Sequence, residues 1–115
     1  MNKTIDSNRA AVYHGRRLAG VLTKKADSFE FTYDSGYLSE PEAMPISLSM
    51  PLREEKYASK ELFPFFDGLL PEGWLLDMIC TTVKIDPEDK FRLLLHTGGD
   101  PIGAVSVKPI EESNG

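Results

Sequence analysis

The side chains that could perform chemistry in this chain are few and widely spaced. The two histidines, His14 and His96, have no Cys, Asp or Glu at the spacing of a metal site. The single cysteine, Cys80, permits neither an internal disulfide nor a multi-cysteine metal site. Five carboxylates could in principle pair for acid–base catalysis, but helix capping and solvation account for most of them. They are Asp67, Glu72, Asp77, Asp86 and Asp100. We therefore expect no metal, no cofactor and no enzymatic activity.

Motifs for phosphate chemistry are also missing from the sequence. It contains no GxxxxGK(S/T) or GxGxxG loop, and no HRD or DFG triplet of a protein kinase. The net charge of −5 argues against direct binding of nucleic acid, because affinity for phosphates rests on clustered Lys and Arg. A local basic patch that could touch an anionic partner consists of Arg16, Arg17, Lys24 and Lys25.

The length of 115 residues suits one domain. We expect this domain at residues 9–110, between flexible ends at 1–8 and 111–115. The polar start MNKTIDSNR leads into no apolar segment of a signal peptide, and no stretch is long enough to span a membrane. These features favour a cytoplasmic protein that does not bind membranes.

The densest apolar stretch, residues 65–85, reads FFDGLLPEGWLLDMICTTVKI and contains the only Trp and the only Cys. Its Pro71-Glu72-Gly73 break allows a helix to begin at about Pro71. Proline suits a first helical turn because its missing N–H would have no partner there, and Glu72 places negative charge at the positive end of the helix dipole.

At 100° per residue this helix is apolar on two sides. One side carries Leu75, Leu76, Ile79, Cys80 and Val83, and the nearly opposite side carries Trp74, Met78 and Ile85. Asp77 and Lys84 separate the two stripes along one flank. A small domain has one core, so the second stripe either closes the far side of that core or binds a partner. Trp and Met are enriched in partner interfaces, but periodicity alone leaves both alternatives open.

The remaining segments predict an α+β domain, with a small antiparallel sheet packed against two to three helices. Short strands are expected at residues 10–15, 16–24 and 28–34, joined by tight turns. Two further strands are expected at 45–51, where Ile, Leu and Met alternate with Ser, and at 102–110.

Two more helices are expected around the central one. Ser59 is expected to cap a short helix that Gly68 ends. Asp86 is expected to cap a third helix, with Pro87 at its first position and Gly98-Gly99 at its end. The apolar face of this third helix consists of Phe91, Leu94 and Leu95.

Three motifs in order carry a family resemblance: PISLSMPL at 45–52, FFDGLLPEG at 65–73 and LLLHTGGDPIGAVSV at 93–107. They resemble the N-terminal subdomain of the HipA family of bacterial serine/threonine kinase toxins, over about residues 11–109. The resemblance implies a fold like HipA N-terminal subdomain 1. It does not imply kinase activity, because the chain has none of the motifs for nucleotide, magnesium or phosphoryl transfer.

A small chain with this pattern is similar to the HipS antitoxins of three-part HipBST toxin–antitoxin systems. The resemblance implies that the chain binds and inhibits a HipT-type serine/threonine kinase toxin, within a larger complex that includes a HipB-like DNA-binding protein. An alternative is a structural N-terminal lobe that completes a HipA-like kinase without inhibiting it. An independent enzyme ranks last.

On this interpretation the second apolar stripe of the central helix binds the kinase. We expect Trp74, presented by the turn of Pro71, Glu72 and Gly73, to dock at the active-site cleft of the kinase. Met78 and Ile85 would extend the contact, and Asp77 would lie on its polar rim.

Overall fold

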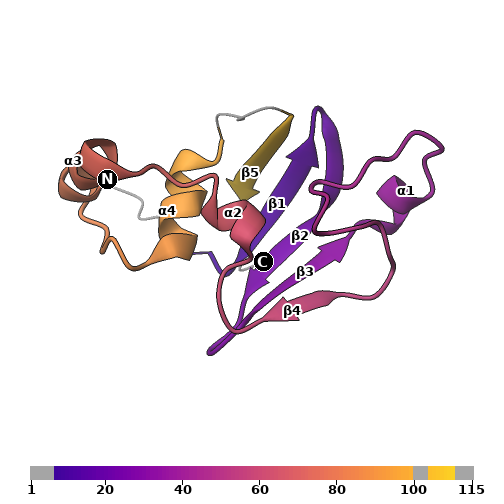
Figure 1. The fold of residues 1–115 in the computed structure, drawn as a ribbon, viewed down its shortest axis with the longest axis horizontal. Coiled ribbons are helices and arrows are strands. Elements are labelled where there is room, and N and C mark those ends of the chain that lie inside the picture. Colours follow the sequence, from indigo (N-terminus) through magenta and orange to yellow (C-terminus); the bar gives the residue numbers. More distant parts are fainter. Residues whose placement is uncertain (1–6, 100–103, 111–115) are drawn as a thin grey trace, which may run out of the picture.

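The computed structural model describes residues 7–99 and 104–110, which form a five-stranded antiparallel sheet covered by helices. The strands are β1 (Arg9–His14), β2 (Arg17–Lys24), β3 (Phe29–Tyr33), β4 (Tyr57–Ser59) and β5 (Val105–Pro109). Their order in the sheet is β4-β3-β2-β1-β5 (Figure 1). The first three strands form the predicted meander, and β5 pairs antiparallel with β1. The predicted α+β class is confirmed.

Four helices lie within the described residues: α1 (Ser35–Leu38), α2 (Pro64–Asp67), α3 (Gly73–Val83) and α4 (Lys90–Thr97). The first two are single turns. Helices α2 and α4 lie over one face of the sheet, whereas α3 lies beyond α4 at the end of the molecule (Figure 1). The sheet therefore shares its core with α2 and α4 and does not extend it to α3.

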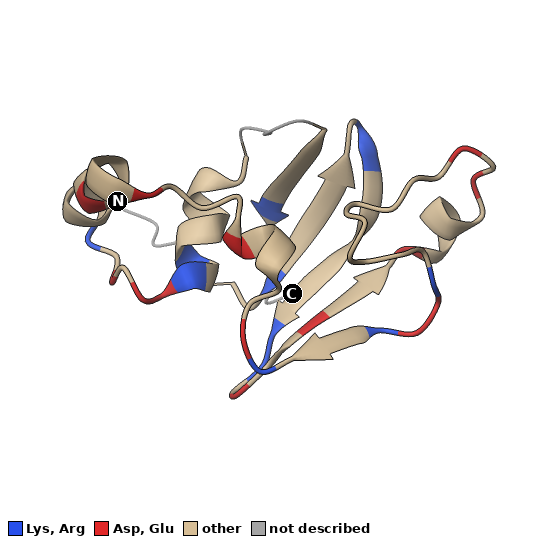
Figure 2. Ribbon diagram, viewed as in Figure 1, with Lys and Arg blue, Asp and Glu red and all other residues tan. Residues whose placement is uncertain are grey.

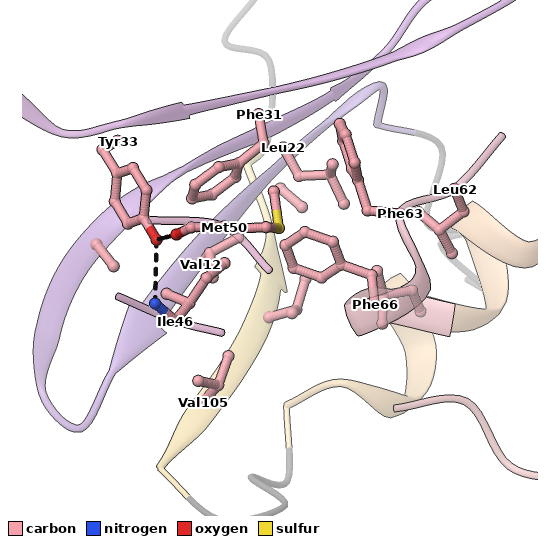
Figure 3. Packing of buried hydrophobic residues seen from close by; sticks show 14 of the residues in the cluster. Val12, Leu22, Phe31, Tyr33, Ile46, Met50, Leu62, Phe63, Phe66 and Val105 are labelled. Carbon is pink, nitrogen blue, oxygen red and sulfur yellow. Dashed lines mark hydrogen bonds between the residues drawn. The ribbon is translucent and has the colours of Figure 1, made fainter. Parts of the chain in front are cut away.

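Aromatic side chains of β3 join the sheet to α2. Phe31 and Tyr33 are buried while Thr32 between them is exposed, as the period of two in this strand predicts. The ring of Phe31 lies 4.9 Å from that of Tyr33 in an edge-on arrangement and 5.8 Å from that of Phe66 in α2 (Figure 3). Phe66 is fully buried, which is worth about 1.5–3 kcal/mol for such a side chain.

The strand predicted at 45–51 is wrong. This segment is a tight turn in which the Met50 N–H donates to the Ser47 carbonyl at 3.0 Å. Ile46 and Met50 are buried, but Leu48 between them is 96% exposed. The alternation of apolar and polar residues fits both a strand and this turn. In the turn the chain reverses at Leu48 and Ser49, which are exposed, while Ile46 and Met50 on either side point inward.

The hydroxyl of Tyr33 forms hydrogen bonds with backbone groups of this segment that a neighbouring strand would otherwise pair. It donates to the Met50 carbonyl and accepts from the Ile46 N–H at 3.1 Å (Figure 3). Tyr37 does the same one turn earlier, donating to the Met44 carbonyl at 2.6 Å. Two tyrosines of the core thus satisfy backbone groups that no strand pairs.

The start of α2 also differs from the prediction. Ser59 belongs to β4, where it pairs with Phe29, and does not cap a helix. The helix begins at Pro64, because proline holds the preceding Phe63 in an extended conformation and cannot continue a helix from before it. Gly68 follows the last helical residue, as predicted.

Helix α4 begins at Lys90, three residues later than the start predicted from Asp86 as its N-cap. Asp89 is the N-cap and accepts from the Arg92 N–H, whereas Asp86 accepts from the Glu88 N–H at 2.9 Å in a separate turn. The predicted apolar face of Phe91, Leu94 and Leu95 is buried, and Gly98 ends the helix, as predicted.

The flexible ends predicted at 1–8 and 111–115 lie outside the described residues, except for Ser7 and Asn8. Ser7 donates from its hydroxyl to the Ile110 carbonyl, and the Asn8 carbonyl accepts from the Lys24 N–H at 2.8 Å. These two residues therefore extend the contacts of β1 with its neighbours, Asn8 toward β2 and Ser7 toward the end of β5. Asp100 also lies outside the described residues.

Replacing Gly20 with alanine is expected to lower the free energy of unfolding by about 1–3 kcal/mol, because overpacking a close contact forces the backbone to shift. A Cβ atom at Gly20 would lie 2.4 Å from the Thr32 carbonyl oxygen and 2.7 Å from the Phe31 ring. Urea denaturation measures the loss. The control is Gly68→Ala, whose Cβ meets nothing closer than 3.4 Å; an equal loss there would contradict the steric explanation.

Replacing Tyr33 with phenylalanine is expected to cost about 1–3 kcal/mol, because it leaves the buried Ile46 N–H and Met50 carbonyl unpaired. Burial raises the pKa of Tyr33. The folded state therefore holds the neutral phenol, and its contribution is complete below the ordinary pKa of about 10 and is lost as the pH rises through the folded value.

Urea denaturation at neutral pH and between about pH 9 and 11 checks both effects, since that interval spans the ordinary tyrosine pKa. The control is Tyr13→Phe, whose hydroxyl has no hydrogen bond to a described residue. It should keep the alkaline loss of stability, while Tyr33→Phe should reduce it. Equal alkaline slopes in the two variants would show that Tyr33 is not responsible.

Candidate partner-binding site on helix α3

The turn before α3 sets the direction of Trp74. The helix begins at Gly73, so Pro71 stands two residues ahead of it and not in its first turn. Glu72 is extended and makes no side-chain capping bond, and Gly73 has φ of +60°, a conformation that glycine adopts at little cost. The predicted start at Pro71 is therefore too early, because the left-handed Gly73 interrupts the helical path. Trp74 follows directly from this break.

A small second cluster attaches α3 to the domain. Its buried members are Cys80, Ile85 and Leu93, with Leu70, Leu76 and Ile79 packed partly against them. Leu93 belongs to α4, so α4 is the helix that covers α3. Cys80 is a small buried group in this contact, as predicted for a cysteine on the core side.

The apolar stripe of α3 that packs against the rest of the domain is narrower than predicted. Leu76, Ile79 and Cys80 face the second cluster, but Leu75 and Val83 are 39% and 41% exposed. Periodicity assigned all five residues to a core, whereas a single neighbouring helix covers only a narrow stripe. The exposed apolar surface of α3 is correspondingly wider, which sequence reasoning missed.

Ile85 is not part of the exposed stripe, contrary to the prediction. Lys84 adopts the left-handed conformation, with φ of +57°, and ends the helix after Val83. The chain therefore leaves the helical path before Ile85, whose N–H donates to the Cys80 carbonyl at 3.1 Å. The side chain turns inward and is only 5% exposed. The helical-wheel prediction is wrong for Ile85 because it assumes that the helix continues past Val83, where α3 ends.

The outer side of α3 carries an apolar surface that consists of Trp74, Leu75 and Met78, here named the α3 face. Trp74 is 75% exposed and Met78 is 49% exposed. The alternative that Trp74 closes the far side of the core is therefore wrong. Leaving a Trp and a Met in water is unfavourable for an isolated domain, and such groupings mark interaction sites.

Two carboxylates lie next to the α3 face, in an acidic part of the chain. Glu72 and Asp77 are exposed, and neither forms an ion pair with a described residue. Residues 72–89 carry five acidic groups and one lysine, a net charge of −4 in a chain whose total is −5. Figure 2 shows the acidic residues on α3 and along the connection to α4. Nearby Lys90 is engaged, since its Nζ lies 2.9 Å from a carboxylate oxygen of Asp67 and this hydrogen bond raises the pKa of Lys90.

The other residues considered for chemistry lie apart. His14 ends β1, and His96 lies in the last turn of α4. The carboxylates of Asp67 and Asp86 serve an ion pair and a local turn, respectively. Within residues 7–99 and 104–110, no three His, Cys, Asp or Glu side chains come close enough to hold a metal ion.

Comparison with known proteins places this geometry in a family. The model of the HipA N-terminal domain matches residues 10–108. The chain belongs to the HipA N-terminal domain family. The match includes all five strands and α3 with its exposed face, apart from the first residue of β1 and the last of β5.

Individual relatives of this HipA-type domain differ in length. An uncharacterized protein of Haemophilus influenzae is 37% identical over 89 residues, which are 77% of this chain and 80% of that protein. "Putative kinase Y4mE" of Sinorhizobium fredii is 31% identical over 102 residues, which are 88% of this chain but only 24% of Y4mE. The chain thus spans most of one relative and about a quarter of the other.

A solved structure, the N-terminal domain of HipA toxin, has the same fold. It superposes with a TM-score of 0.68 and 30% sequence identity, covering 91% of this chain and 94% of that one. The predicted HipA-like fold is thereby confirmed. Among the described residues, no helix has the length and apolar character needed to cross a membrane.

The fluorescence of Trp74, the only tryptophan, reports directly on the α3 face. We expect emission close to that of tryptophan in water, and quenching by acrylamide nearly as strong as in the urea-unfolded chain. Relative to a neutral tryptophan amide, quenching by iodide should be reduced more than quenching by caesium, because Glu72 and Asp77 attract cations and repel anions. Blue-shifted emission with weak acrylamide quenching would contradict the exposed placement of Trp74.

Proposed function

We propose that this chain is an antitoxin that binds a HipT-type serine/threonine kinase toxin through the α3 face and inhibits it. The observation that carries the proposal is the 75% exposure of Trp74 at the start of a helix that a single neighbouring helix covers. A tryptophan of this kind often supplies a large share of the binding energy at an interface.

Family membership supports a kinase as the partner. "Putative kinase Y4mE" and a second relative from Sinorhizobium fredii, "Putative kinase Y4dM", align with this chain over 24% and 21% of their own lengths, respectively. A domain that is part of a longer kinase in these relatives has a natural binding site on such a kinase when it is a separate chain. The resemblance to HipS antitoxins adds that the partner is a HipT-type kinase, which lacks this subdomain.

The proposed mechanism is steric. Trp74 leaves the turn of Pro71 and Glu72 through the left-handed Gly73, and this conformation sets the direction in which the indole projects. Inserted at or beside the active-site cleft, Trp74 hinders the engagement of nucleotide or substrate. Met78 extends the apolar contact, and Asp77 lies on its rim.

The wider assembly follows from the same proposal. The antitoxin acts in the cytoplasm with its kinase, and a HipB-like protein supplies DNA binding within a larger complex. The chain itself contributes no catalysis and no direct contact with nucleic acid, and it needs no cofactor. Its role in the complex is recognition through side chains of α3.

A second candidate function is a structural lobe that completes a HipA-like kinase without inhibiting it. The alignment of 88% of this chain within Y4mE favours this candidate, because there the same domain is part of the longer protein. The two functions predict different outcomes when the kinase and this chain are produced together. Only an antitoxin abolishes the toxicity of the kinase.

Co-expression with a HipT-type kinase is expected to restore growth for the wild-type chain and not for Trp74→Ala. Loss of a central Trp typically costs about 2–4 kcal/mol, or about 30-fold or more in affinity, so a pull-down should also lose the variant. The matched control is Leu48→Ala, which truncates another exposed apolar side chain on the turn at 47–50.

The outcomes separate the proposals. Rescue by wild type and Leu48→Ala, but not by folded Trp74→Ala, supports the antitoxin and its anchor. Rescue by all three removes Trp74 from the mechanism and keeps the antitoxin. Binding without any rescue contradicts the antitoxin and supports the structural lobe.

A further inference from the structure

The carboxylates of Glu72 and Asp77, beside the α3 face, form no hydrogen bond or ion pair with the described residues that would stabilise the fold. Glu72 precedes the helix but makes no capping hydrogen bond. Asp77 lies within the helix, where the positions three and four residues away are Gly73, Trp74, Cys80 and Thr81, none of which is basic. Neither carboxylate forms an ion pair with a described residue. No interaction within the fold therefore accounts for the carboxylate of Asp77. For Glu72 the fold provides only the weak attraction of the helix dipole.

Both carboxylates are positioned to act in binding. Glu72 lies two residues before Trp74 and Asp77 three residues after it, so the indole emerges between two exposed negative charges. The charge is concentrated here, because residues 72–89 hold a net −4 and the other residues together hold −1. The basic side chains that follow are oriented toward other acids, Lys90 toward Asp67 and Arg92 toward Asp89.

We propose that the α3 face binds an apolar pocket rimmed by lysine or arginine side chains, which pair with Glu72 and Asp77. This inference rests on the proposed function and specifies the chemistry of the kinase surface that receives Trp74. A kinase cleft supplies such a rim because it holds nucleotide phosphates with cationic groups. The apolar contact provides most of the affinity, while the two carboxylates accelerate association and fix the orientation of the helix.

Association kinetics with a purified HipT-type kinase test this inference. Glu72→Gln combined with Asp77→Asn should lower the association rate constant about fivefold at low salt, and should flatten its dependence on ionic strength, because charge steering is screened by salt. The dissociation rate should change less than it does for Trp74→Ala.

Two controls isolate the position of the charges. Glu54→Gln combined with Glu55→Gln removes the same charge from an exposed loop outside α3 and should change the association rate less than twofold. Glu72→Asp combined with Asp77→Glu keeps both charges and should retain the salt dependence of the wild type. Urea denaturation should show the same stability for all three double variants, since the replaced side chains are exposed.

An equal reduction by the Glu54 and Glu55 pair would overturn the inference, because it would assign the effect to net charge alone. Unchanged kinetics for the Glu72 and Asp77 pair would overturn it as well, while leaving Trp74-dependent binding intact. If the wild-type chain does not bind the kinase at any salt concentration, the proposed function itself fails.

Discussion

Helix α4 is buried on two sides, and the position of the candidate site depends on this double contact. Phe91, Leu94 and Leu95 pack into the core of the sheet, while Leu93 packs against Cys80 of α3. Removing α4 from the sheet would therefore also remove the support of α3. Leu70, before α3, packs against both clusters, but no residue of α3 itself belongs to the larger core. Its exposed side follows from this arrangement, because a helix with one neighbour buries only one narrow stripe.

Helix α3 is consequently weakly held compared with the sheet. Its 11 residues make about three turns, a length that is marginal for an isolated helix in water. Its last carbonyl groups are closed by Lys84 in a left-handed conformation, which costs about 1 kcal/mol for a residue other than glycine. Regions of this kind lie at the low end of local stability within a domain. Under the proposed function, the partner that binds the α3 face stabilises the helix that makes the contact.

The sequence predicts where the helices and strands lie better than it predicts which elements pack against them. Phe31 and Tyr33 reveal β3 through an alternation that the turn at 47–50 also shows, so the same pattern is right in one segment and wrong in the other. The wheel places Trp74 and Met78 correctly but cannot detect that the left-handed Lys84 ends the helix before Ile85. Leu75 and Val83 are misassigned because periodicity does not count the covering helices. Competing acids, Asp86 and Asp89, make the start of α4 ambiguous.

The order of the strands limits how a partner can approach the sheet. Its two edges are β4, which has only three residues, and β5, which ends in an exposed Lys108 and in Pro109, a residue without a backbone N–H. Short strands, lysine and proline are the features that prevent another chain from adding a strand to an edge. The backbone of this domain is thus a poor template for pairing. The same features oppose the pairing of this sheet edge to edge with the sheet of a second copy.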